Sequence, residues 1–373
     1  MSFFSLITKN LLRRRFRTAM TIMALATAIG SVMALSGVAS GFTESFRDVY
    51  QSHRVDIVVT REGSADRLSS SLPDRFVRVV DACPGVHRTV GVLLETLSLE
   101  DQQVFGIPAM GMPIDSWMFA DYRMIASSAS DELPSIYLGQ NVSQRTELNA
   151  GDVINIFDQP FQIGGIFETS SVWENGSIIA PLESLQELTG REGQITYINV
   201  TVNDDVPPED IDEVTGAIES TDPKLLALPT DAFVESDTRM QMAGAMAWMT
   251  SAIALIVGAI GTLNTMMTSV MERTGEIGIL RAVGWTMKRV SAVILLESIA
   301  LAVIATILGG IGASVLLVAL SHSDAASGVL APSIGPGLWL RGLAIGLFIG
   351  VLGAIGPSMR AAKMPPTLAL RNL

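Results

Sequence analysis

Four long apolar runs dominate the pattern of hydrophobic and polar positions along the chain. They cover residues 18–43, 241–271, 290–320 and 338–359. Each run is at least as long as the roughly 20 apolar residues that a helix needs to cross a bilayer. The pattern therefore predicts four transmembrane helices.

Between the first two runs the pattern changes to short segments, which is typical of a folded domain outside the bilayer. Short β-branched and aromatic runs between turn residues predict strands at 55–60, 90–99, 104–107, 136–138, 153–157, 161–167, 177–180 and 195–202. Helical spacing of apolar residues predicts helices at 72–80, 182–189 and 207–220. Residues 44–240 are therefore expected to form a mixed α+β domain, of one lobe or two. We expect a stalk helix at each end of it, at 43–53 and at 227–242, the second continuing into the next span.

The distribution of charge predicts which segments lie on which side of the membrane. Residues 43–239 carry 12 Lys/Arg and 33 Asp/Glu, a net charge of −21, whereas the rest of the chain has a net charge of +9. Because Lys and Arg close to the spans stay on the cytoplasmic side, the N-terminus 1–17, the segment 272–289 and the C-terminus 360–373 are expected inside. The domain 44–240 and the loop 321–337 are expected outside. The first run exceeds the roughly 7–15 residues of a signal-peptide core, so we interpret it as an uncleaved anchor.

Composition narrows the possible chemistry. The 49% of hydrophobic residues is high for a soluble chain of 373 residues and typical of a membrane protein. The single cysteine, Cys83, cannot form a disulfide within the chain, and the three histidines are too far apart in sequence to suggest metal ligands. The sequence has neither a catalytic constellation nor a phosphate-binding loop of the form G-x-x-x-x-G-K-S/T. We therefore expect no catalytic, cofactor or metal site in this chain, and no nucleic-acid partner.

The segment that joins the second and third runs has more pattern than an ordinary loop needs. It reads NTMMTSVMERTGEIGILRAVGW over residues 264–285. Four charged residues fall within ten positions: Glu272, Arg273, Glu276 and Arg281. Ile277 and Leu280 can give a short helix one apolar side, and two glycines are interleaved with them. An ordinary loop is the alternative, but it would not require this pattern.

This segment resembles the corresponding segment of the MacB/FtsX superfamily of ABC-exporter permeases, where the pattern is approximately N-x-M-x-x-S-V-x-E-R-T-x-E-I-G-x-x-(K/R)-A-(I/V/L)-G-A. The matching residues are Asn264, Met266, Ser269, Val270, Glu272, Arg273, Thr274, Glu276, Ile277, Gly278, Arg281, Ala282 and Gly284. Gly275, where a basic residue is frequent, and Trp285, where alanine is usual, depart from it. The closing PSMRAAKMPPTLALRNL and, more loosely, residues 137–168 are similar to the same family.

The resemblance implies a permease subunit of an ABC transporter in the cytoplasmic (inner) membrane of a bacterium. ATP and Mg²⁺ would bind a separate ABC ATPase subunit, so the chain itself would not be an enzyme. The permease would form a dimer with a second copy or a homologue, would contact membrane lipid, and would meet a periplasmic adaptor or another outer partner. Its function would be export or extraction of a lipophilic or amphiphilic substrate. The alternative is a regulatory transducer that switches an external partner without transport.

The resemblance also assigns a role to the segment 272–289, which would be the helix that docks on the ATPase. The residues assigned to it are Glu272, Arg273, Thr274, Glu276, Ile277, Gly278, Leu280, Arg281 and Gly284. The charges would orient this helix, Ile277 and Leu280 would supply apolar contact area, and Gly278 would lie where the helix meets a groove of the ATPase.

Polar and small residues inside the apolar runs are further candidates. Asn264 and Glu297 are polar within predicted spans, where an ionisable group is costly. For Glu297 we favour a structural contact with a neighbouring helix over a direct functional role. Gly342, Gly346 and Gly350 recur every four residues, and this spacing indicates a face for helix packing rather than a pore lining.

Overall fold

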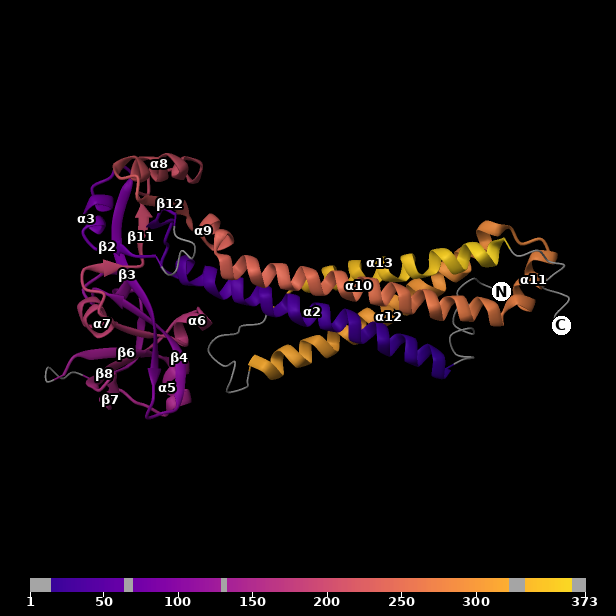
Figure 1. The fold of residues 1–373 in the computed structure, drawn as a ribbon, viewed down its shortest axis with the longest axis horizontal. Helices are drawn as coiled ribbons and strands as arrows, with labels where there is room; N and C mark the ends of the chain where they lie inside the picture. The colour runs from indigo at the N-terminus through magenta and orange to yellow at the C-terminus, as the bar shows by residue number, and fades with distance from the viewer. Residues whose placement is uncertain (1–14, 64–69, 129–132, 322–332, 364–373) are drawn as a thin grey trace. The chain divides into compact units, whose positions relative to one another are not determined.

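The computed structural model describes residues 15–63, 70–128, 133–321 and 333–363, which form two compact units (Figure 1). One unit, called here the helical unit, contains α2 (Arg15–Ser52) as far as Ala39, α10 (Thr238–Glu272) from Gly244, α11 (Thr274–Ala282), α12 (Met287–Ser321) and α13 (Pro336–Ala362). The other, called the outer unit, runs from Ser40 to Ala243 and also includes Leu320 and Ser321 at the end of α12. Most residues of the predicted N-terminus 1–17, loop 321–337 and C-terminus 360–373 lie outside the described ranges.

Four helices of the helical unit are long and apolar enough to cross a membrane: α2, α10, α12 and α13. Small residues let three of them approach closely. Where α2 meets α12, a Cβ built on Gly30 would lie 2.9 Å from the carbonyl oxygen of Gly309. The two backbones are therefore in contact there, which only glycine permits.

The glycine stripe of α13 lies against the same two helices. A Cβ on Gly342 would meet the side chain of Met33 in α2, and one on Gly350 would lie 2.9 Å from the Cβ of Ala302 in α12. A Cβ on Gly346 would collide with the hydroxyl of Thr306. These three positions have room for hydrogen and little else, so the stripe is a helix-packing surface.

α10 packs much less against the rest of the chain than the other long helices. Only 6% of its apolar 18-residue stretch is buried, compared with 44% of the corresponding stretch in α12 and 39% in α13. Its exposed apolar side chains include Trp248, Ile253 and Ile260. Most of the α10 surface is therefore available to lipid or to another protein.

The outer unit is built on a mixed sheet. Its strands are β1 (Ile57–Arg61), β3 (Val86–Leu99), β4 (Val104–Met112), β5 (Arg123–Ser127), β6 (Ser135–Gly139), β7 (Val153–Ile156), β8 (Gln159–Glu168), β9 (Ile178–Pro181), β11 (Tyr197–Val202) and β12 (Leu225–Pro229). The strand order is β12-β1-β11-β3-β4-β9-β6-β8-β5, and β7 pairs with β8. The pairs β4–β9 and β6–β8 are parallel and the other pairs antiparallel, while β2 (Leu72–Pro73) and β10 (Gln194–Ile195) form a separate small sheet.

The long strand β3 joins two halves of this sheet, each with its own hydrophobic cluster. Up to Val92 it pairs with β11, and from Leu93 it pairs with β4. The first half is covered by α3 (Phe76–Asp81) and by α8 (Ile211–Thr221), which follows the 3₁₀ turn η2 (Pro208–Asp210). The second is covered by α5 (Gln140–Thr146) and α7 (Leu182–Thr189). The predicted fold class, four apolar helices with an α+β domain, is confirmed.

The last turns of α2 belong to a third cluster inside the outer unit. Phe46 packs edge-on against Tyr50 and against Trp173 in α6 (Val172–Asn175), and Tyr50 packs edge-on against Phe233 in α9 (Thr230–Ser236). The segment 43–53 is therefore helical as expected, but it is part of the domain core. The aromatic side chains of this predicted stalk helix are buried in that core.

Two further predictions differ from the structure. Residues 227–242 are not one helix. Residues 225–229 form β12, which pairs with all of β1, and the non-helical residue Asp237 separates α9 from α10. The Oδ1 atom of Asp237 accepts hydrogen bonds from the backbone N–H groups of Arg239 and Met240, which makes it the cap of α10. Residues 72–80 begin as β2, and their helix starts only at Phe76, after Pro73.

Candidate functional site

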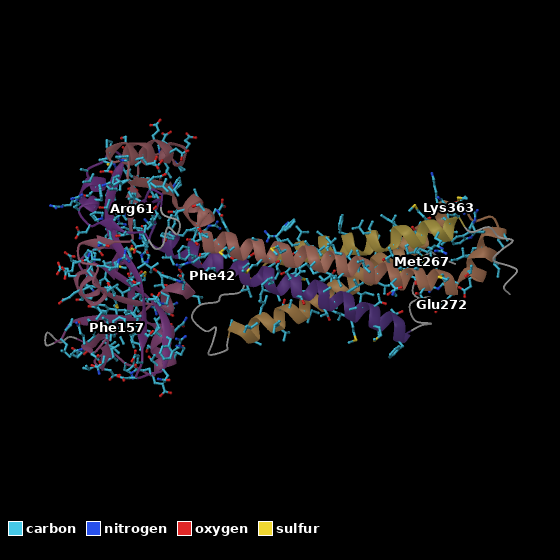
Figure 2. The ribbon with its side chains drawn as sticks, in the orientation of Figure 1. Phe42, Arg61, Phe157, Met267, Glu272 and Lys363 are labelled. Carbon is cyan, nitrogen blue, oxygen red and sulfur yellow. The ribbon has the colours of Figure 1, made fainter. Side chains whose placement is uncertain are left out.

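The candidate site is the α11 turn, where the sequence pattern is densest. α10 ends at Glu272, Arg273 has a non-helical backbone, and α11 runs from Thr274 to Ala282. Gly284 then adopts a φ of +98°, in the left-handed region that favours glycine. The Nη1 atom of Arg281 donates a hydrogen bond of 3.2 Å to the carbonyl oxygen of Trp285, so Arg281 closes this turn. In Figure 2, Glu272 and Lys363 mark the end of the helical unit where α11 lies.

The inward side of α11 carries the residues that were predicted to face a partner. Ile277 is buried in a cluster with Val270, Val290, Ile294 and Ala361. Gly278 is buried too, and Leu280 is half-buried. Ile277 and Leu280, predicted to supply apolar contact area to a partner, therefore both line the cavity beneath α11 in this structure.

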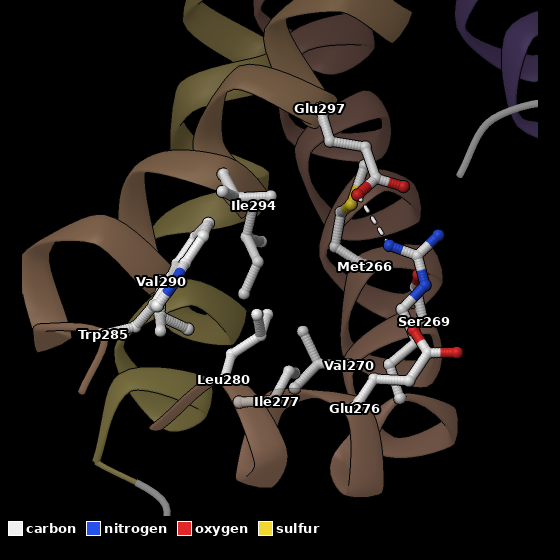
Figure 3. A pocket seen from close by; sticks show the side chains of 12 residues that line it. Met266, Ser269, Val270, Glu276, Ile277, Leu280, Trp285, Val290, Ile294 and Glu297 are labelled. Carbon is white, nitrogen blue, oxygen red and sulfur yellow. Dashed lines mark hydrogen bonds and ion pairs between the residues drawn. The ribbon is translucent and has the colours of Figure 1, made fainter. Parts of the chain in front are cut away.

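A cavity of about 60 Å³ lies under α11 (Figure 3). Most of its lining is apolar, and four lining residues are polar or charged: Ser269, Arg273, Glu276 and Glu297. In Figure 3 Met266, Leu280 and Ile294 surround the open space, with Trp285 at its side. The contact between α11 and the spans is thus incompletely filled.

One ion pair lies in the lining of this cavity and joins two of the predicted residues. The Nη1 atom of Arg273 lies 2.8 Å from the Oε2 atom of Glu297 (dashed line in Figure 3), and their side chains are 14% and 7% exposed. A carboxylate at this depth is tolerable because it has a cationic partner. The structural interpretation of Glu297 is consistent with this contact.

The outward side of α11, together with Val283 just after its last residue, carries a second apolar stripe that the sequence analysis missed. Val283 is 76% exposed and Ile279, four residues earlier, is 46% exposed. Met271 and Met287 are exposed as well, at the two ends of the turn. Spacing of i, i+4 could have revealed Ile279 and Val283. The sequence analysis had already assigned the apolar side of the helix to Ile277 and Leu280. It did not consider that a short helix can carry apolar residues on two sides.

The remaining predicted site residues lie apart from this turn or take other roles in it. Asn264 is exposed on α10 and lines a groove of about 350 Å³ between α10 and the N-terminal half of α2. It does not line the cavity that Glu297 lines. Glu276 is exposed at the cavity mouth, and the hydroxyl of Thr274 donates to the carbonyl oxygen of Met271.

A buried polar cluster in the outer unit was also missed. Glu174 is fully buried, and its Oε1 atom lies 3.0 Å from Nε2 of His53 and accepts a 2.6 Å hydrogen bond from the hydroxyl of Tyr122. Burial, and then the neighbouring Glu174 carboxylate, raises the pKa of Tyr122 well above its usual value. Asp121, 3.6 Å from Nδ1 of His53, completes the cluster. His53, Tyr122 and Glu174 are each more than 50 residues apart in sequence, so no local sequence motif could have predicted the cluster.

Within the described residues, no group of three or more His, Cys, Asp or Glu side chains could hold a metal ion. At the α11 turn, the described residues offer an exposed apolar stripe flanked in sequence by charged side chains.

Comparison with protein families gives two matches that together cover most of the chain. A model of the MacB-like periplasmic core domain matches residues 18–220. A model of the FtsX-like permease C-terminal domain matches residues 248–366, which include α11.

Named relatives agree with these matches. An uncharacterized ABC transporter permease of Methanocaldococcus jannaschii is 31% identical over 246 residues, covering 61% of this chain and 58% of that protein. The macrolide export ATP-binding/permease protein MacB of Brucella abortus is 26% identical over 386 residues, covering 96% of this chain and 58% of MacB. An uncharacterized ABC transporter permease of Mycobacterium tuberculosis is 25% identical over 356 residues, covering 91% of this chain and 92% of that protein. The chain thus spans little more than half the length of the first two relatives.

Among solved structures, the periplasmic region of MacB from Actinobacillus actinomycetemcomitans aligns with a TM-score of 0.39 and 11% identity. The alignment covers 55% of this chain and 97% of that structure.

Proposed function

Because the chain belongs to the MacB/FtsX family of ABC transporter permeases, we propose that it couples an ABC ATPase to movement of its outer unit. Coupling would begin where the outward side of α11 docks on the ATPase. The single observation that carries this proposal is the exposed stripe of Ile279 and Val283, because large apolar side chains exposed together mark interaction surfaces.

The charged residues around the stripe suit a polar rim. Glu272, Glu276, Lys288 and Arg289 are exposed and lie within seven residues of it in sequence. Apolar side chains at the centre of an interface supply contact area, and charges at the rim steer and orient the partner.

From the docking site, the motion would pass along α2 and α10. Both helices contribute residues to the helical unit and to the outer unit, and the last turns of α2 lie in the aromatic core of the outer unit. The sparsely buried α10 would meet a second permease in a dimer. In this proposal α11 lies in the cytoplasm with both chain ends, and the outer unit lies on the far side of the membrane.

The load would be a lipophilic or amphiphilic molecule that the outer unit exports or extracts. MacB relatives are named for macrolide export, and we extend to this chain only the class of substrate. Hydrolysis of ATP would take place on an ABC ATPase subunit outside this chain.

Docking is tested with Val283→Asp in permease co-expressed with the candidate ABC ATPases of the same genome. The substituted residue is exposed, so folding should be unaffected, while a carboxylate in an apolar contact should reduce ATPase co-purification and stimulation about tenfold or more. Val153→Asp, in an exposed position of β7, is the matched control and should leave both unchanged. Normal coupling in Val283→Asp would refute docking through this stripe.

A further inference from the structure

We infer that the Arg273–Glu297 ion pair is the positioning contact that fixes α11 against α12 and so aims the Ile279–Val283 stripe at the partner. This inference rests on the proposed docking function. It adds a role for two residues that do not belong to the exposed docking stripe, since both side chains are largely buried.

α11 needs such a contact because it cannot hold its position alone. A helix of nine residues is too short to be stable without tertiary contacts. Its apolar contact through Ile277 is non-directional, and the cavity beneath it leaves room for α11 to shift. The ion pair is directional, because the hydrogen bond from Nη1 to Oε2 sets both a distance and an angle.

The pair is also placed where it has the most control over direction. Arg273 is the non-helical residue between α10 and α11, with φ −104° and ψ 17°. Glu297 is in the third turn of α12, on the far side of the Gly284 turn. An ion pair between Arg273, where α10 ends and α11 is about to begin, and Glu297 in α12 therefore restricts rotation of α11 about its first residue. Without it, the apolar contacts would allow several orientations of the outward stripe.

The charge on Glu297 also argues for a tie rather than for packing alone. An apolar side chain of similar size could occupy this position without the free-energy cost of removing a charge from water. A buried carboxylate has that cost and requires a cationic partner. Glu276 lines the same cavity and carries a like charge, and Arg273 is the one cationic side chain among the residues that line it. In some proteins a buried ion pair specifies one geometry among those that apolar packing would permit, and this is the role inferred here for Arg273 and Glu297.

The experiment combines charge reversal with a reporter of α11 position that does not need the ATPase. Arg273→Glu, Glu297→Arg and the double swap are made in full-length permease with Cys83→Ser. Each is combined with Ile277→Cys and Ile294→Cys, which occupy one buried cluster and should form a disulfide when α11 is in place. ATPase stimulation is measured in parallel on the variants without added cysteines.

We expect each single reversal to lower both the rate of disulfide formation and ATPase stimulation about tenfold or more, because it leaves two like charges together. The double swap should restore most of both. Glu297→Gln, which keeps a hydrogen-bond acceptor and should not impair insertion, is expected to give intermediate values. Restoration by the swap is a result that general instability would not produce.

The outcomes separate this inference from the docking proposal. If Val283→Asp abolishes stimulation while Arg273→Glu changes neither readout, docking stands and the positioning role is overturned. A swap that fails to restore disulfide formation would also overturn it. If Val283→Asp has no effect, the docking proposal fails, and the disulfide rate alone then decides whether the pair positions α11.

Discussion

Removal of the Tyr122 hydroxyl group should lower the thermal stability of the outer unit. In Tyr122→Phe the Oε1 atom of Glu174 loses the 2.6 Å hydrogen bond from Tyr122 and keeps only the contact with His53. A hydrogen bond to a charged group contributes about 1.5–3 kcal/mol. For a domain of this size, 1 kcal/mol shifts the melting temperature by about 2–4 °C. The expected decrease in Tm is therefore about 3–12 °C.

The assay is thermal unfolding of full-length protein in detergent, followed by near-ultraviolet circular dichroism. Tyr137→Phe is the matched control, because the Tyr137 hydroxyl makes no hydrogen bond to any residue in the described part of the chain and its ring is only half-buried. Tyr122→Phe is then repeated in a Glu174→Gln background. The decrease should shrink there, since the two residues interact. Equal decreases in both backgrounds would refute the reasoning that the bond to Glu174 is what the hydroxyl contributes.

Three other predictions concern pH, packing and topology. Because the pKa of Tyr122 is raised in the folded protein, its contribution to stability is complete below about pH 10, where tyrosine in the unfolded chain titrates. This contribution is lost as the pH rises further. Melting curves at alkaline pH should therefore show a smaller loss of stability in Tyr122→Phe than in the unaltered protein. Gly346→Leu should collide with Thr306 and prevent recovery of monodisperse permease, whereas Gly312→Leu, which faces open space, should be tolerated. In a Cys83→Ser background, a membrane-impermeant maleimide should label Asp158→Cys in intact cells and leave Thr274→Cys unlabelled until the membrane is opened; labelling of Thr274→Cys in intact cells would contradict the proposed topology.

The parts of the fold that could be predicted are those with a strong local signal. Apolar runs located the four long helices, and apolar spacing placed α7 at Leu182–Thr189 with the bounds that the structure has. β5 was missed because its residues alternate between exposed and half-buried positions, and an edge strand of this kind has little hydrophobic signal. β12 was taken for helix because its pairing with β1, more than 160 residues earlier, decides its conformation.

Sequence analysis singled out the α11 turn as the candidate site, but it did not predict how the turn is oriented. The pattern around Glu272 and Arg281 identified the α11 turn, yet it could not tell which of two apolar sides faces outward. Burial of Ile277 against Val290 and Ile294 decides this, and those residues follow in the next helix. The tie between Arg273 and Glu297 was hidden for the same reason, because it exists only once the Gly284 turn brings α12 back beside α10.

The central claim, that the outward side of α11 contacts an ABC ATPase, is tested most directly by site-specific photo-crosslinking. A photoreactive amino acid is placed at Val283, and at Val315 as the control, because Val315 is similarly exposed but lies on the apolar surface of α12. Membranes containing the permease and its co-expressed ATPase are then irradiated. The account predicts a permease–ATPase adduct from position 283 and none from position 315. An adduct from position 315 but not from 283, or none from 283 when the ATPase is bound, would contradict it.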